Sequence, residues 1–136
     1  MLDASQHTGA DTTFSHRMVA APVELRPMRR RLAGWLDGLH LPGETVMDIV
    51  TATDEACANA IEHGADCDPS EQVAVEAHVA LDRVVVLVSG PGAWRHVPSG
   101  PHRGRGLLIM RGLMDEVLIR RDPDRSTVRL VKVLDD

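Results

Sequence analysis

The sequence of 136 residues is poor in lysine and in aromatic residues. Lys132 is the only lysine, tyrosine is absent, and the aromatic side chains are those of Phe14, Trp35 and Trp94. Proteins that bind nucleic acids typically have a basic surface and aromatic side chains on which bases stack. This chain has a net charge of −5 and few aromatic side chains. The composition therefore argues against a nucleic acid as the direct partner.

Cysteines and long apolar runs are also scarce. Cys57 and Cys67 are too few for a disulfide framework and form no CxxC zinc pattern, so both are expected to be reduced, with Cys57 in the core. The seven histidines include no HExxH motif, which argues against a metal cage. No apolar run approaches membrane-spanning length, and the polar N-terminus lacks the features of a signal peptide. We therefore expect a cytoplasmic protein.

The 43% hydrophobic and 26% charged residues are those of a globular chain, and the length suits one domain. We expect a flexible tail over residues 1–11 and a folded domain over residues 12–134. The periodicity predicts, in order, an edge strand over 12–20, helices over 22–40 and 44–63, a hairpin of strands over 72–81 and 83–90, a loop over 91–106, a short helix from 107, and a second hairpin over 116–134. This order predicts an α+β two-layer sandwich, with helices on one face of a mixed, mostly antiparallel sheet.

The helix predicted over residues 44–63 carries Glu55, Asn59 and His63 at four-residue steps. Residues with this spacing share one helix face, and here it is opposite the apolar face. A carboxylate could accept a proton from a hydroxyl group or water, and an amide oxygen could be one ligand of Mg²⁺. Taken alone, the same face could be merely solvated, and His63 could instead interact with the dipole at the helix end.

A glycine-rich segment precedes the short helix. It contains Gly100, Gly104 and Gly106, interleaved with Arg103 and Arg105. Glycines let backbone amides approach an anion, a helix N-terminus adds partial positive charge, and arginine matches phosphate oxygens. The segment is not a Walker A motif, because that motif requires a lysine. Taken alone, it could equally be a flexible connection.

Three stretches in this order resemble one family. "TDEACANAIEHG" resembles the N-box (E-x-x-x-N-x-x-x-H) of the GHKL ATPase and kinase superfamily, "HRGRGLLIMRGLMDEV" its second glycine box, and "STVRLVKVL" its closing strand. Together they resemble the anti-sigma-factor serine kinases of the RsbW and SpoIIAB type, over about residues 14–134. The resemblance implies the Bergerat fold, with ATP and Mg²⁺ bound between the N-box helix and the glycine-rich segment.

The resemblance also implies roles for individual residues. Glu55 would be the general base, Asn59 the magnesium ligand, and Thr127 the threonine beside adenine. The other implied ATP-contacting residues are His63, Gly90, Gly92 and the phosphate-cradling run Gly104, Arg105, Gly106 and Leu107. Family members phosphorylate a serine of a small anti-anti-sigma protein of the STAS type, sequester a sigma factor when that protein is unavailable, and are usually dimers. The resemblance implies the same protein partners and a homodimer here.

The sequence departs from the family pattern at the first glycine box, D-x-G-x-G, whose aspartate accepts a hydrogen bond from the amino group of adenine. Either Val88 or Gly90 stands in its place, and no carboxylate lies between Asp82 and Trp94. Ser89 or a backbone carbonyl could substitute for it. Three hypotheses follow: a serine kinase, a non-catalytic anti-sigma or partner-binding module with a degenerate nucleotide site, and a nucleotide or anion sensor. Glu55 favours the kinase, because binding alone needs no base.

The basic run Arg29-Arg30-Arg31 has two interpretations. A short run of like charges on a predicted helix can be simply an exposed, solvated face. It can also be a patch that contacts a partner protein. The sequence leaves both open.

Overall fold

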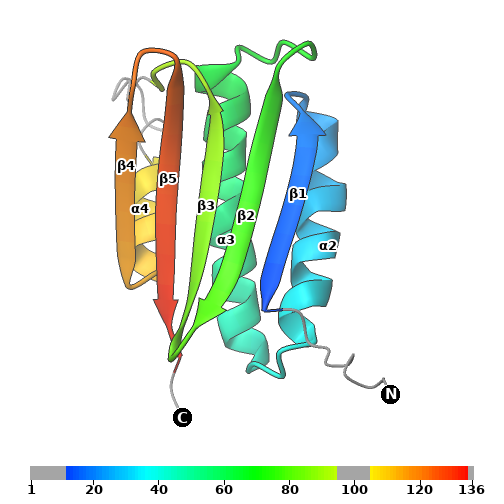
Figure 1. Cartoon of the computed structure of the whole chain (residues 1–136), viewed down its shortest axis with the longest axis vertical. Coiled ribbons are helices and arrows are strands. Elements are labelled where there is room, and N and C mark those ends of the chain that lie inside the picture. The colour runs from blue at the N-terminus through cyan, green and yellow to red at the C-terminus, as the bar shows by residue number, and fades with distance from the viewer. Residues whose placement is uncertain (1–11, 95–104, 135–136) are drawn as a thin grey trace.

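The computed structural model describes residues 12–94 and 105–134. Five strands form one sheet in the order β1-β2-β3-β5-β4, and the three α-helices all pack on one of its faces (Figure 1). In chain order the elements are β1 (Thr13–Val19), the 3₁₀ turn η1 (Pro22–Glu24), α2 (Leu25–Asp37), α3 (Gly43–Asn59), the π-helical turn η2 (Ala60–Gly64), β2 (Gln72–Ala80), β3 (Arg83–Pro91), α4 (Arg105–Leu113), β4 (Glu116–Arg121) and β5 (Arg125–Val133). The predicted α+β two-layer sandwich is confirmed.

The sheet contains both predicted hairpins, β2–β3 and β4–β5, and β1 is an edge strand as expected. β5 returns between β3 and β4 and pairs with both. The sequence predicted a mixed, mostly antiparallel sheet. All four pairings of the described strands are antiparallel, so the described part of the sheet is not mixed. This arrangement brings the end of β3 next to the start of β5.

The core lies between the sheet and the helices. Strand residues that point towards the helices are mostly valines, and they pack against apolar residues of α2 and α3 because side chains alternate between the two faces of a strand. The fully buried members include Met28, Leu32, Leu36, Ile49, Cys57, Val73, Val75, Val84, Val86, Val88 and Leu130. Burial raises the pKa of the Cys57 thiol, so this residue behaves as a small apolar side chain, as predicted.

Two helices differ from their predicted bounds near the candidate site. The helix expected over 44–63 is α-helical only as far as Asn59 and continues as η2. α4 begins at Arg105, so Gly106 belongs to its first turn and not to the preceding loop. α4 ends at Leu113, and the chain then turns into β4.

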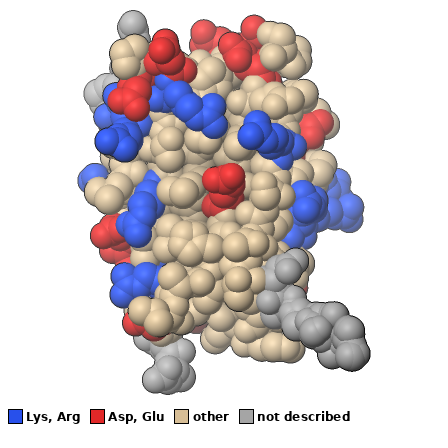
Figure 2. Space-filling model, viewed as in Figure 1, with Lys and Arg blue, Asp and Glu red and all other residues tan. Residues whose placement is uncertain are grey.

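None of the described helices packs on the second face of the sheet, and Figure 1 is viewed from this side. Its middle is largely uncharged, while Lys and Arg side chains gather towards its sides (Figure 2). Val85 and Val131 are only 3% and 2% exposed on this face, because neighbouring side chains of the sheet cover them. None of the described helices is long and apolar enough to cross a membrane.

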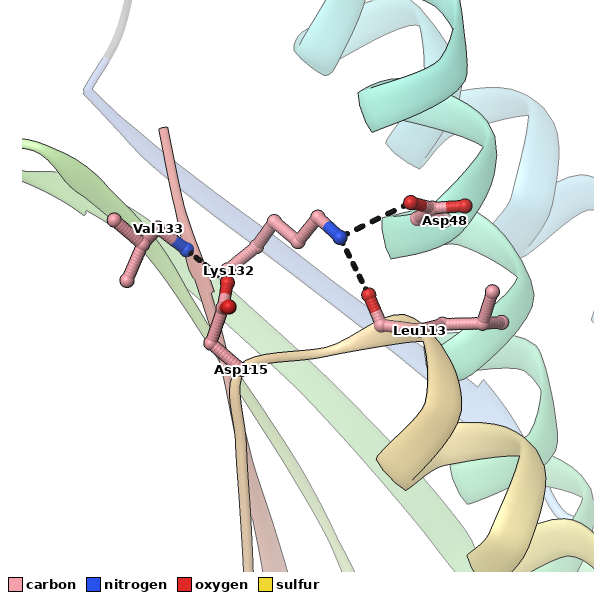
Figure 3. Close-up of polar contacts among 5 residues, drawn as sticks. All are labelled: Asp48, Leu113, Asp115, Lys132 and Val133. Atoms are coloured by element: carbon pink, nitrogen blue, oxygen red, sulfur yellow. Dashed lines mark hydrogen bonds and ion pairs between the residues drawn. The ribbon is translucent and has the colours of Figure 1, made fainter. Parts of the chain in front are cut away.

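The single lysine joins three elements behind the sheet (Figure 3). Nζ of Lys132, on β5, donates to Oδ2 of Asp48 on α3 at 3.0 Å and to the carbonyl oxygen of Leu113 at the end of α4 at 2.6 Å. Nearby, the backbone N–H of Val133 donates to Oδ2 of Asp115 at 2.7 Å. Lys132 therefore satisfies a terminal carbonyl of α4 and holds this helix against α3.

Lys132→Met is expected to lower the free energy of unfolding by about 1–3 kcal/mol, because it leaves a half-buried carboxylate and a helix-end carbonyl without their donor. Urea denaturation at pH 7 measures the change. Arg83→Met is the control, because its pair with Asp82 is exposed and such pairs contribute about 0–1 kcal/mol. Equal losses in the two variants would contradict this role of Lys132.

Candidate functional site

The N-box helix and the glycine-rich segment meet at Gly106. Glu55 and Asn59 lie in the last two turns of α3, both half-buried, and α4 packs beside them. A Cβ atom placed on Gly106 would lie 3.1 Å from Oε1 of Glu55 and 3.1 Å from Nδ2 of Asn59. The structure therefore brings a carboxylate, an amide and the first turn of a helix to one point, with a glycine where they approach most closely.

The carboxyl group of Glu55 is held in an unusual electrostatic environment. Burial raises its pKa above that of an ordinary glutamate, and the neighbouring acids Asp54 and Glu62 raise it further. Asp54 has its own partner, since Nη1 of Arg29 lies 3.0 Å from its Oδ1. Among the described residues no ion pair involves Glu55. A half-buried carboxylate of this kind is a stronger base than an exposed one and is suited to accepting a proton.

The amide of Asn59 points into the same space as Glu55. Its Oδ1 lies 3.6 Å from the Cβ position of Gly106. Among residues 12–94 and 105–134, no group of three or more His, Cys, Asp or Glu side chains could hold a metal ion. One amide oxygen beside one carboxylate nevertheless fits Mg²⁺, which takes few protein ligands when phosphates supply the others.

His63 does not continue the line of Glu55 and Asn59 along an α-helix. It lies in η2, where the π-helical turn is wider than an α-helical one and changes the angular step between residues. Its Nε2 lies 3.9 Å from Oε1 of Glu62, and 35% of the side chain is exposed. The structure therefore places His63 near the site, in contact with Glu62.

The end of η2 meets the end of β3 through glycines. Gly92 has a φ of +78°, which favours glycine, and a Cβ on it would lie 2.9 Å from the carbonyl oxygen of Gly64. A Cβ on Gly64 would lie 2.4 Å from Nε1 of Trp94 and 2.6 Å from the carbonyl oxygen of Pro91. The glycines allow a backbone contact that joins the N-box helix to the first glycine box.

The two positions that could stand for the missing aspartate differ in their surroundings. Val88 is fully buried in the core, whereas Gly90 faces the end of α3. A Cβ on Gly90 would lie 3.4 Å from Cβ of Ala60 and 3.7 Å from Cζ2 of Trp94. A side chain at position 90 would therefore point towards the site, but glycine provides none.

Trp94 and Ser126 are two residues of this region that the sequence analysis did not select. The Trp94 backbone N–H donates to Oγ of Ser126 at 3.2 Å, and Oγ of Ser126 donates to the carbonyl oxygen of Gly92 at 2.8 Å. Nε of Arg121 donates to the carbonyl oxygen of Trp94 at 2.8 Å. The one available signal was that Trp94 is the only aromatic residue between positions 36 and 136.

Thr127, predicted to lie beside adenine, is on the face of the sheet away from the described helices. Along β5 the fully buried Ser126 and Val128 point towards the helices, so Thr127 points to the uncovered face, where it is paired in register with Ser89 and Arg120. Ser126 is the hydroxyl-bearing residue on the helix face. The register therefore favours Ser126 over Thr127 as the hydroxyl group nearest the site, because a shift of one residue in a strand reverses the face. A contact of Thr127 with adenine stays a prediction.

The phosphate-cradling run is only partly described. Gly104 lies outside the described residues, and Arg105 is exposed as the first residue of α4. The side chain of Leu107 is partly buried against the core. Gly106 is thus the member of the run that the structure places against Glu55 and Asn59.

The basic run on α2 is engaged within the chain at two of its three positions. Arg29 pairs with Asp54, as described above. Arg31 contacts Nδ1 of His16 at 2.7 Å and lies 5.3 Å from the ring centre of Phe14. Arg30 is exposed. These contacts favour a structural role for much of the run, and its role in partner contact stays a prediction.

Comparison with known proteins places these features in context. A family model described as the histidine kinase-like ATPase domain matches residues 18–132. The chain is 30% identical over 101 residues to an anti-sigma F factor of Clostridium perfringens, covering 65% of this chain and 72% of that protein. It is 29% identical over 131 residues to the serine-protein kinase RsbW of Bacillus licheniformis, covering 85% of this chain and 81% of that protein.

A solved structure is similar as well. The crystal structure of the RsbU and RsbW domains of a Mycobacterium tuberculosis protein superimposes with a TM-score of 0.69 at 26% identity, over 90% of this chain. The match covers 32% of the Mycobacterium tuberculosis chain, which is about three times as long as the matched region. The similarity extends over nearly the whole of the two-layer sandwich.

Proposed function

Because the chain belongs to the histidine kinase-like ATPase domain family, we propose that it is an ATP-dependent serine protein kinase of the anti-sigma type. One observation carries the proposal. Gly106, at the start of α4, lies against both Glu55 and Asn59, so a base, a metal-binding oxygen and a helix N-terminus converge. Phosphoryl transfer requires this combination of positioning and charge stabilisation more than it requires covalent chemistry.

ATP would bind with its phosphates at the first turn of α4. Backbone N–H groups in a first helical turn lack partners within the helix and attract anions, and Arg105 adds a positive charge there. The absent side chain of Gly106 lets the phosphates approach this turn. The Asn59 oxygen would hold Mg²⁺, which neutralises charge on the phosphates when it is bound.

Glu55 would act on the serine of the protein substrate. Its carboxylate accepts the hydroxyl proton as the serine oxygen forms a bond to the γ-phosphorus. The bond between this phosphorus and the bridging oxygen breaks, and ADP leaves with that oxygen. The burial that raises the pKa of Glu55 strengthens it as a base for this step.

The names of the relatives support two kinds of protein partner for this chain. The name of the Clostridium perfringens relative supports a sigma factor as one partner, and the name of the Bacillus licheniformis relative supports a protein serine as the phosphate acceptor. We propose a STAS-type anti-anti-sigma protein as the source of that serine. A homodimer stays a prediction, which light scattering coupled to size-exclusion chromatography would test.

A second candidate function is favoured by one observation. Neither Val88 nor Gly90 supplies a carboxylate for the adenine amino group. A charge-assisted hydrogen bond of this kind contributes about 1.5–3 kcal/mol. The alternative is therefore a partner-binding anti-sigma module whose nucleotide site has degenerated.

Calorimetric titration of the chain with ATP-Mg, and with GTP-Mg in parallel, separates the two functions. The kinase requires saturable binding of ATP that weakens when EDTA removes the magnesium. A binding-only module would show no heat with either nucleotide, and it would capture its sigma factor equally well with and without ATP-Mg.

A further inference from the structure

Trp94 fills the space between the ends of η2 and β3. Only 5% of the residue is exposed, and its ring lies between two glycines. The edge with Nε1 and Cδ1 would be 2.4 and 2.5 Å from a Cβ on Gly64, and Cζ2 would be 3.7 Å from a Cβ on Gly90. We propose that, in the nucleotide-free chain, the indole of Trp94 occupies the place of the purine base, so that nucleotide binding displaces the ring.

The shape of the ring supports this inference, which rests on the proposed function. Indole and purine are both flat systems of a fused five-membered and six-membered ring, so a space that holds one fits the other closely. Gly90 faces this space with no side chain, and it is one of the two positions at which the family aspartate is missing. The space that the indole fills is therefore next to one of the two positions from which a carboxylate would read adenine.

The location also suits a nucleotide. Gly64 lies five residues after Asn59, at the far end of the π-helical turn η2. Phosphates held beside Asn59 and Gly106 would thus leave room for a ribose before the base reaches Gly64 and Gly90. The proposed phosphate and base positions lie along one helix.

The backbone of Trp94 is hydrogen-bonded, whereas the N–H group of its indole ring has no hydrogen-bond partner among the described residues. The backbone is fixed by hydrogen bonds with Ser126 and Arg121. Nε1 is buried and has no hydrogen-bond acceptor among the described residues. Because an unpaired buried N–H is unfavourable, the ring gains a hydrogen bond when it rotates out into water.

The first test uses fluorescence of Trp94 alone. Trp35→Phe removes the only other tryptophan, which lies on α2 and packs against Phe14. In this variant, ATP-Mg is expected to shift the emission to longer wavelength and to increase quenching by acrylamide severalfold, because the ring becomes exposed. Unchanged emission and quenching, with ATP binding detected by calorimetry, would overturn the displacement and leave the kinase proposal intact.

The second test uses substitutions of Trp94 and Gly90. Trp94→Ala is expected to tighten ATP-Mg binding at least about tenfold, because no ring has to be displaced. Gly90→Asp alone should gain little affinity, since its side chain would point at the indole 3.7 Å away. Combined with Trp94→Ala, it should create a preference for ATP over GTP.

Additive effects of the two substitutions, or weaker binding by Trp94→Ala, would overturn the proposal, because the ring would then not obstruct the base. Circular dichroism verifies that each variant is folded, and the fluorescence test needs no change at Trp94. The absence of ATP binding in every variant, the wild type included, would overturn both this inference and the kinase function.

Discussion

Glu55→Ala is expected to slow phosphoryl transfer to the partner serine by at least about a hundredfold, because a positioned general base contributes about 10²–10⁴ in rate. The affinity for ATP-Mg should change little, since the base acts on the protein substrate. Initial rates of labelled phosphate transfer at saturating ATP give the first quantity, and calorimetry gives the second.

Glu62→Gln is the matched control, because Glu62 is exposed and lies about two turns further along the same helical segment. It should transfer phosphate at the wild-type rate at pH 8. Equal transfer by Glu55→Ala and the wild type would reject Glu55 as the base.

The pH dependence of transfer provides a separate readout of Glu55. Its pKa is raised by burial first and by Asp54 and Glu62 next, so the carboxylate becomes protonated at a higher pH than an ordinary glutamate. Transfer should therefore fall as the pH decreases through this raised pKa. Glu62→Gln removes one neighbouring negative charge and should move the fall to lower pH. A pH profile that is identical in the two proteins would contradict the assignment.

Gly106→Val is expected to weaken ATP-Mg binding and to slow transfer, each by at least about tenfold. A Cβ at this position is already 3.1 Å from Oε1 of Glu55 and from Nδ2 of Asn59, and valine adds two methyl groups. Both functional side chains must move away, and the approach to the first turn of α4 is blocked. Calorimetry and initial transfer rates measure the two effects.

Gly112→Val is the control for Gly106→Val. Gly112 lies in the same helix, and a Cβ placed on it meets no atom within 4 Å. Replacing an exposed helical glycine should leave binding unchanged and favour the helix slightly, by less than about 1 kcal/mol. If both variants lose ATP binding to the same extent, the effect comes from α4 in general and not from contact with Glu55 and Asn59.

Local patterns in the sequence determined most of the fold. Period-two alternation identified the strands of both hairpins, and helical spacing identified α2 and α3, because these patterns follow from which face of each element is buried. The same spacing placed Glu55 and Asn59 together on the face of α3 that lies away from the core. The glycine-rich segment before α4 was recognised from its composition. Its approach to Glu55 and Asn59 was implied only by family resemblance.

Tertiary structure alone decided how the pieces meet, because these contacts join residues distant in the chain. The register of β5 against β3 places Ser126 on the helix face and Thr127 on the other, and no local pattern specifies that register. The packing of α4 on α3 brings Gly106 to Glu55 and Asn59. The contact of η2 with the end of β3 buries Trp94. This burial depends on the packing of all the surrounding residues, which no local sequence pattern specifies.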